Sequence, residues 1–138
     1  FEQEWFDLYE AIEREDPTRA TGRAAIIDRT PSPRAFLRAT VDGVPAGVGL
    51  GVLWGAYLGI FCMATHAEFR RRGAASGMLR AMAIWADMNR ARTAYLQVTA
   101  GNLAGLAVYA RAGFQTAYNY PYRLFNRDAP GPRQGLRA

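Results

Sequence analysis

The stretch that decides the fold runs from residue 93 to residue 114 and reads TAYLQVTAGNLAGLAVYARAGF. Its first part, 93–99, is rich in β-branched and aromatic residues, which is typical of a strand. Asn102 then suits a helix N-cap and Gly113 the C′ position, so the sequence predicts a helix over 102–112. The side chains expected to face the core from this helix are Leu103, Leu106, Ala107 and Ala110.

Two polar side chains of this helix fall on one edge. Asn102 and Tyr109 are seven positions apart, which places them within about 20° of each other around the helix axis. A ligand could lie along that edge. The simpler interpretation of each residue stays open, with Asn102 as an ordinary N-cap and Tyr109 as a half-buried aromatic residue.

A second informative stretch lies upstream, where residues 70–76 read RRRGAAS between a predicted strand and a helix predicted over 73–90. The first N–H groups of a helix have no intrahelical partner and carry partial positive charge, so they attract anions. Gly73 lets the backbone approach a ligand closely, and three arginines add positive charge. The stretch is neither a P-loop nor a dinucleotide fingerprint. A charged loop without a ligand is the alternative. The apolar stripe of the helix comprises Ala75, Met78, Leu79, Met82, Trp85 and Ala86.

The remaining helices and strands are predicted from the periodicity of apolar residues and from the glycines and prolines that interrupt it. Helices are predicted over 3–15, with Trp5, Leu8, Tyr9 and Ile12 on its apolar face, and over 19–28. Strands are predicted over 35–42, 44–53, 56–64, 113–119 and 122–127. Asp42-Gly43 suits a hairpin turn between the first two strands. The order predicts an α/β fold (an α+β mixed sheet) with helices on both faces, forming one domain over 1–127 and a disordered tail over 128–138.

The composition of the chain excludes a disordered polyelectrolyte and a collagen-like repeat. The chain has 138 residues, 50% of them hydrophobic and 21% charged, which suits one globular domain. All 17 basic residues are arginine, and the net charge is +5. Residues 1–16 hold seven acids and one arginine, which suits either a solvated helix face or a partner-binding segment. With one cysteine, Cys62, and one histidine, His66, we expect no disulfide, no metal site and a reducing cytoplasmic setting.

Residues 43–65 are uncharged and long enough to cross a membrane. Six glycines and Pro45 punctuate this stretch, so two strands that turn around residues 54–56 fit it better than a transmembrane helix. The chain begins at Phe1 without a basic and then apolar start, so we expect neither a signal peptide nor a membrane partner.

Together, the two stretches resemble the GNAT superfamily of N-acetyltransferases. Arg70-x-x-Gly73-x-Ala75 matches the family's pyrophosphate-binding turn. Asn102, Tyr109 and Gly113-Phe114 match its later motif, in which Gly105 replaces the usual alanine. The resemblance covers residues 35–127 and implies the GNAT fold. The first strand of that fold is missing from the sequence, as expected of a chain that begins late in the fold.

The resemblance implies that acetyl-CoA acts as co-substrate and that a small-molecule amine or a peptide amine accepts the acetyl group. The cofactor arm would lie along Met63–Thr65, and the pyrophosphate would lie on the turn at 70–76. Tyr109 would be the catalytic general acid. The implied cofactor-binding residues are Met63, Ala64, Thr65, Arg70, Arg71, Arg72, Gly73, Ala74, Ala75, Ser76, Asn102 and Tyr109. A homodimer is a further expectation from the family.

The sequence departs from the family pattern in three places. The strand over 56–65 lacks the carboxylate that many members use as a base, and His66 and Glu68 follow it in a turn. Arg71 replaces a glycine, which requires that its backbone φ stay negative, and Ala74 replaces an isoleucine. Aromatic side chains suited to the acceptor site are Trp5, Tyr9, Tyr118, Tyr120 and Tyr122.

Two other functions stay open. A GNAT-like domain could bind an acyl-CoA without catalysis and regulate a partner. A nucleic-acid-binding module could use Arg70–Arg72, but most aromatic residues fall at core positions, so we expect no nucleic-acid partner.

Overall fold

One four-stranded sheet organises the molecule, in the order β1-β2-β3-β4. The computed structural model describes residues 2–14 and 17–121. The strands are β1 (Arg34–Val41), β2 (Val44–Trp54), β3 (Tyr57–Thr65) and β4 (Thr93–Leu96). The first three strands pair antiparallel, whereas β4 joins β3 in parallel. A parallel neighbour needs a crossover connection, and the chain supplies it as a short 3₁₀ turn (Ala67–Phe69) and the long helix α3 (Ala74–Met88).

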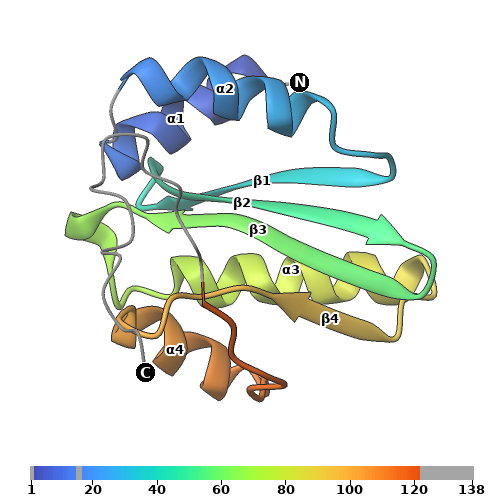
Figure 1. Ribbon diagram of the computed structural model, residues 1–138. Helices are drawn as coiled ribbons and strands as arrows, with labels where there is room; N and C mark the ends of the chain where they lie inside the picture. Colours follow the sequence, from blue (N-terminus) through green and yellow to red (C-terminus); the bar gives the residue numbers. More distant parts are fainter. Residues whose placement is uncertain (1, 15–16, 122–138) are drawn as a thin grey trace, which may run out of the picture.

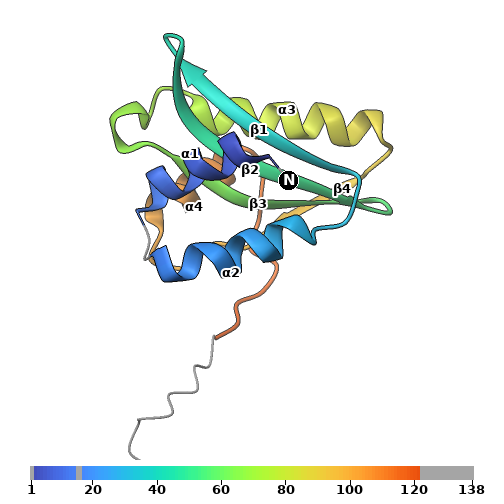
Figure 2. The same ribbon diagram turned by 90° about the horizontal axis from the view of Figure 1, so that it is seen from above.

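Helices cover both faces of the sheet, as the sequence predicts (Figure 1). Helices α1 (Gln3–Glu13) and α2 (Pro17–Asp28) lie on one face, and α3 and α4 (Leu103–Arg111) lie on the other. Figure 2, which is seen from above, shows α1 in front of the strands and α3 behind them. We call these two sides the α1/α2 face and the α3/α4 face.

The uncharged stretch 43–65 forms two strands joined by a tight turn, as its glycines predict. Asp42 and Gly43 both have positive φ, at 52° and 77°, which is the geometry of a two-residue hairpin loop. No helix among the described residues has the length and apolar character that a membrane crossing needs.

Each face of the sheet has its own hydrophobic core. On the α1/α2 face, Trp5 is fully buried and its indole N–H donates to the carbonyl of Leu37 at 2.9 Å. The buried members of this cluster are Trp5, Phe6, Ile27, Val48, Leu50, Val52 and Ala64. The cluster on the α3/α4 face comprises Leu53, Leu58, Ile60, Leu79, Met82, Ala86 and Ala91. The apolar stripes predicted for α1 and α3 are therefore confirmed.

Three alternate glycines of β2 let α3 approach the sheet closely. A Cβ at Gly49 would lie 2.8 Å from the Met82 side chain, and one at Gly51 would lie 3.2 Å from the Trp85 ring. At Gly47 the nearest atom would be the carbonyl oxygen of Ala64, at 2.8 Å. These glycines therefore serve packing inside the strand that the sequence predicts over 44–53.

Three predictions about the later elements are wrong. The predicted strand over 93–99 ends at Leu96, and residues 113–119 form neither helix nor strand. The second of these lacks a partner among the described strands, and an unpaired strand is not stable alone. Helix α4 also turns a different side to the core, because Leu103 is 74% exposed whereas Val108 and Tyr109 pack against the sheet. Apolar residues occur on all sides of this helix, so their periodicity does not indicate which side is buried. The strand predicted over 122–127, Tyr122 and the tail lie outside the described residues.

Candidate active site

Strands β3 and β4 separate halfway along β3. Their pairing runs only from Tyr57 to Ile60 on β3, while β3 itself continues to Thr65. A bulge follows the last paired residue: the register with β2 shifts between Leu50↔Phe61 and Val48↔Ala64, and Cys62 has a φ of 51°. Among the described strands, none pairs with residues 61–65 on the side of β4. The predicted edge Met63–Thr65 therefore borders a fork in the sheet, where an extended ligand could make backbone hydrogen bonds.

The start of α3 is open to an anion. Its N-cap, Gly73, has φ 85° and ψ 0° and provides no side-chain cap. The first helical hydrogen bond runs from the N–H of Gly77 to the carbonyl of Gly73 at 2.8 Å. Within the described part of the chain, no hydrogen bond satisfies the N–H groups of Ala74, Ala75 and Ser76. These groups and the helix dipole favour a negatively charged ligand.

The three arginines before this helix play different parts. Arg72 donates to Asp42 in the β1–β2 turn at 2.6 Å, and its guanidinium lies 5.9 Å from the centre of the Phe69 ring. Arg70 and Arg71 are exposed and form no ion pair with any other described residue. The φ of Arg71 is +62°, which contradicts the expectation of a negative value. The turn adopts the left-handed geometry that a glycine would take without strain, so Arg71 has a strained backbone just before the uncapped start of α3.

The side chain of Asn102 caps the start of α4. The Asn102 Oδ1 accepts the N–H of Gly105 at 2.9 Å, so Asn102 is an N-cap, as one interpretation of the sequence had it. Gly105 leaves room for this cap, because a Cβ there would lie 2.7 Å from the Asn102 Nδ2. The chain leaves α4 at Gly113, whose φ is 96°, as the C′ position requires.

Tyr109 lies half-buried on α4, with its ring centre 6.1 Å from that of Phe114. Burial raises the pKa of its hydroxyl above the usual value. The phenol is therefore protonated at neutral pH and can donate a proton. The other interpretation of Tyr109, as a half-buried aromatic residue, is thus confirmed, and a catalytic role is compatible with it.

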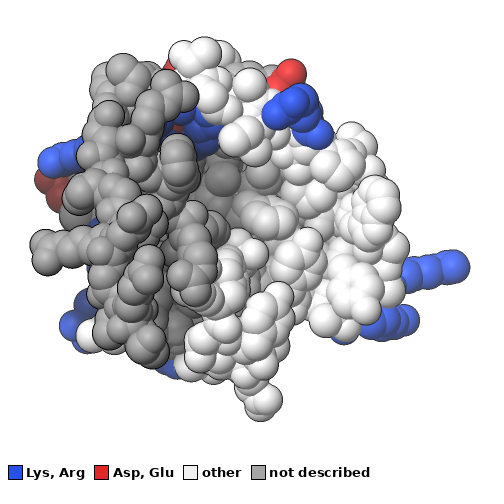
Figure 3. Space-filling model, in the orientation of Figure 1, with Lys and Arg blue, Asp and Glu red and all other residues white. Residues whose placement is uncertain are grey.

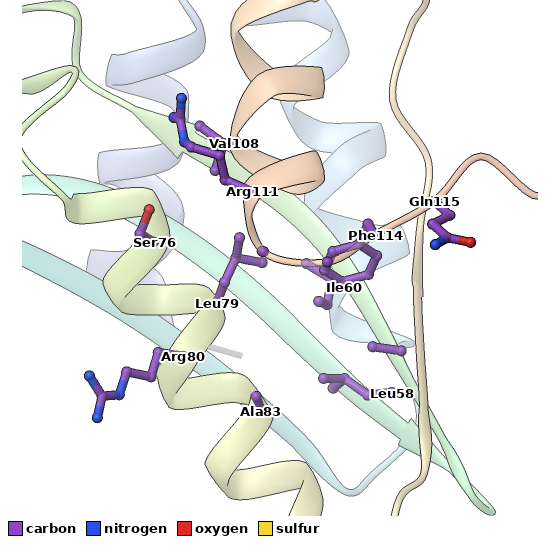
Figure 4. A pocket seen from close by; sticks show the side chains of 13 residues that line it. Leu58, Ile60, Ser76, Leu79, Arg80, Ala83, Val108, Arg111, Phe114 and Gln115 are labelled. Carbon is purple, nitrogen blue, oxygen red and sulfur yellow. The ribbon is translucent and has the colours of Figure 1, made fainter.

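A pocket of about 760 Å³ opens between α3 and α4. Figure 4 shows Leu79, Phe114 and Ile60 around its apolar floor, with Ser76 and Arg80 on α3 and Arg111 on α4 at its border. Its lining comprises Leu58, Ile60, Ser76, Leu79, Arg80, Ala83, Ala94, Val108, Arg111, Ala112, Gly113, Phe114 and Gln115. Of residues 70–76, only Ser76 lines the pocket. The pocket therefore adjoins the turn before α3 but does not contain it.

Comparison with known proteins identifies the fold and its family. The sequence pattern of the acetyltransferase (GNAT) family matches residues 1–114. The chain belongs to the GNAT acetyltransferase family. The uncharacterized N-acetyltransferase YobR of Bacillus subtilis (strain 168) is 28% identical over 120 residues, which are 87% of this chain and 49% of YobR. The chain thus spans about half the length of this relative.

Solved GNAT structures superimpose on most of the chain. The AAC(6')-Iy enzyme in complex with a CoA-linked bisubstrate analogue has a TM-score of 0.68 at 14% identity, covering 90% of this chain and 93% of the enzyme. The ribosomal-protein-S18-alanine N-acetyltransferase of Escherichia coli has a TM-score of 0.70 at 19% identity, covering 86% and 76%. At these identities the likeness establishes the fold, a mixed sheet with helices on both faces.

Three features of this GNAT domain were not predicted. The ion pair of Arg72 with Asp42 joins residues 30 positions apart, and no local pattern signals it. Cys62 lies at the bulge beside α1, where burial raises the pKa of its thiol and a hydrogen bond from the Tyr9 hydroxyl opposes this shift. His66 lies in the turn after β3, and its Nδ1 is buried without a hydrogen-bond partner among the described residues.

Proposed function

We propose that this GNAT protein transfers the acetyl group of acetyl-CoA to a primary amine by direct attack in a ternary complex. The observation that carries the proposal is the open start of α3 next to the unpaired edge of β3. The start of α3 would hold the phosphates of CoA, and the edge of β3 would hold its extended, amide-bearing arm. The two features follow one another in the same order as these two parts of CoA.

The cofactor would bind through backbone groups for the most part. Its pyrophosphate would accept hydrogen bonds from the N–H groups of Ala74, Ala75 and Ser76, with Arg70 and Arg71 adding charge from outside. Arg72 would hold the turn in place through Asp42. The pantetheine amides would pair with Met63–Thr65, which directs the thioester toward the fork.

The chemistry then needs one proton donor and a neutral amine. The amine nitrogen attacks the thioester carbonyl carbon, the C–S bond breaks, and the Tyr109 hydroxyl gives its proton to the departing thiolate sulfur. The proton lost by the amine passes to water, because β3 has no carboxylate over Tyr57–Thr65 to take it directly, and the Tyr109 phenolate regains a proton from water. Asn102 would contact the cofactor arm through the amide nitrogen that its capping role leaves available.

The acceptor is an amine of a small molecule or a peptide, and the protein acts in the cytoplasm, with a homodimer as the expected assembly. The basic balance of the chain is then explained in part by a small polyanionic cofactor rather than by nucleic acid.

The test is Tyr109→Phe in a thiol-release assay with acetyl-CoA and a panel of amines. Because a general acid contributes about 10²–10⁴-fold, kcat should fall by that factor, which is much more than any loss of affinity for acetyl-CoA. Tyr57→Phe removes a hydroxyl from an exposed tyrosine at the distant end of β3 and serves as the control. An unchanged kcat in Tyr109→Phe would contradict the assigned role.

Calorimetry with acetyl-CoA, combined with the thiol-release assay, separates catalysis from regulation. Calorimetric binding of acetyl-CoA without turnover of any amine would favour a catalytically silent, acyl-CoA-binding domain. Absence of binding would contradict both functions.

A further inference from the structure

Aromatic side chains beside the fork face solvent on the α1/α2 face of the sheet. Phe61 on β3 is 36% exposed and Tyr95 on β4 is 47% exposed. Residues of a strand alternate between the two faces. Leu58 and Ile60 join the core on the α3/α4 face, so Phe61 projects from the opposite one. Tyr95 pairs with Gly59 and projects to the same side as Phe61.

The two rings form one surface. Their centres lie 6.1 Å apart with an angle of 85° between the ring planes, which is a favourable edge-to-face geometry. Gly59 lies beneath them, because a Cβ there would be 2.6 Å from the Phe61 ring and 2.9 Å from the Tyr95 hydroxyl oxygen. The absence of a side chain at Gly59 therefore lets the rings converge.

This surface lies across the sheet from the start of α3. The helix packs on the α3/α4 face, so phosphates at its N-terminus would lie on that side. Phe61 is the first residue after the last β3–β4 pair, and Tyr95 precedes the last paired residue of β4. A thioester at the fork is therefore reachable from the α1/α2 face, past these two rings.

The two strands that carry the rings are uncharged. Neither Tyr57–Thr65 nor Thr93–Leu96 contains an acidic or a basic residue. In Figure 3, which views the molecule from the same side as Figure 1, most of the described surface is white, and basic side chains lie at its margins. A polycationic acceptor would find no carboxylate on these strands, whereas a flat or apolar group would bury area against the rings.

We propose that Phe61 and Tyr95 bind the acceptor, and that the acceptor is a primary amine carried on an aromatic or apolar framework. The inference rests on the proposed function, because it places the acceptor beside the thioester. The rings hold the framework of the amine, and the nitrogen reaches the carbonyl carbon through the fork.

The test measures binding of phenethylamine by ligand-observed NMR, with and without CoA, and its turnover with acetyl-CoA. Phe61→Ala and Tyr95→Ala should each raise the Kd and the KM for phenethylamine about tenfold, without changing the calorimetric Kd for acetyl-CoA. Trp54→Ala is the matched control, since Trp54 is 71% exposed at the β2–β3 turn, away from the fork. Spermidine and kanamycin serve as polycationic probes and should bind more weakly than phenethylamine.

Equal phenethylamine binding by the wild type, Phe61→Ala and Tyr95→Ala would overturn the assignment, as would an absence of phenethylamine binding to the wild type. Preference for spermidine or kanamycin would overturn the acceptor class. Failure of acetyl-CoA to bind would instead refute the proposed function, whatever the amine results.

Discussion

Helices α3 and α4 both follow a strand, yet their first turns differ. Helix α3 begins at Gly73 with no side-chain cap and no acidic residue in its first turn. Helix α4 begins at Asn102, whose side chain accepts the N–H of Gly105. One start keeps its N–H groups for a ligand, and the other satisfies one of its own. We therefore assign the proposed anion site to α3, although both helices have partial positive charge at their N-termini.

The two helices also differ in how firmly they are held. Five residues of α3 are buried, and its side chains fill the space above the glycines of β2. No residue of α4 is buried. Buried contacts therefore hold α3 against the sheet, whereas α4 depends on half-buried contacts such as those of Val108 and Tyr109.

The largest expected effect comes from truncating the core side of α3. Met82 is fully buried, so Met82→Ala should lower the free energy of unfolding by about 2–5 kcal/mol. Leu103→Ala in α4 should change it by less than about 0.5 kcal/mol, because Leu103 is 74% exposed. Urea unfolding of both variants measures the difference. Similar losses would show that α4 is buried as firmly as α3.

The cap of α4 gives an intermediate effect. Asn102→Ala should cost about 1 kcal/mol of stability, because the N–H of Gly105 loses its acceptor. Asn102→Asp keeps the oxygen acceptor and should retain the stability, but it removes the amide nitrogen. Weaker acetyl-CoA binding in both variants would support a cofactor contact. Unchanged binding in Asn102→Asp would limit Asn102 to capping.

The backbone at Arg71 gives the smallest change in stability, and in the opposite direction. A left-handed φ costs a non-glycine residue about 1–2 kcal/mol, and glycine has its own entropic cost of about 0.5–1 kcal/mol. Arg71→Gly should therefore raise the free energy of unfolding by about 0.5–1 kcal/mol while weakening acetyl-CoA binding.

Arg90 is the matched control for this variant, because its φ is also 62° and it follows the far end of α3. Arg90→Gly should stabilise the fold by a similar amount and leave acetyl-CoA binding unchanged. Equal loss of binding in both variants would show that net charge, rather than position, matters.

The sequence predicted what local patterns determine. Asp42-Gly43 indicated a hairpin, Asn102 and Gly113 marked both ends of α4, and the apolar periods of α1 and α3 were right, because each depends on near neighbours in the chain. The resemblance to the GNAT family, which the comparisons confirm, also rested on two short motifs with local geometry.

Contacts between residues far apart in the sequence could not be predicted from such local patterns. The bulge at Cys62, the pair of Arg72 with Asp42 and the convergence of Phe61 and Tyr95 over Gly59 all need two elements in register. The positive φ of Arg71 is a local feature, yet it was predicted wrongly. Residue preference argued against a left-handed conformation, and the geometry of the turn prevailed.

The central claim is that the open start of α3 holds the phosphates of acetyl-CoA, and one pair of variants tests it directly. Ser76→Glu places a carboxylate in the third position of α3, where helix propensity and the dipole favour an acid. Ala104→Glu places the same charge on an exposed position in the first turn of α4. Calorimetric titration with acetyl-CoA should show a Kd raised at least about tenfold in Ser76→Glu and unchanged in Ala104→Glu, with both proteins folded. Equal affinities in the wild type and Ser76→Glu would contradict the assignment of this turn as the phosphate site.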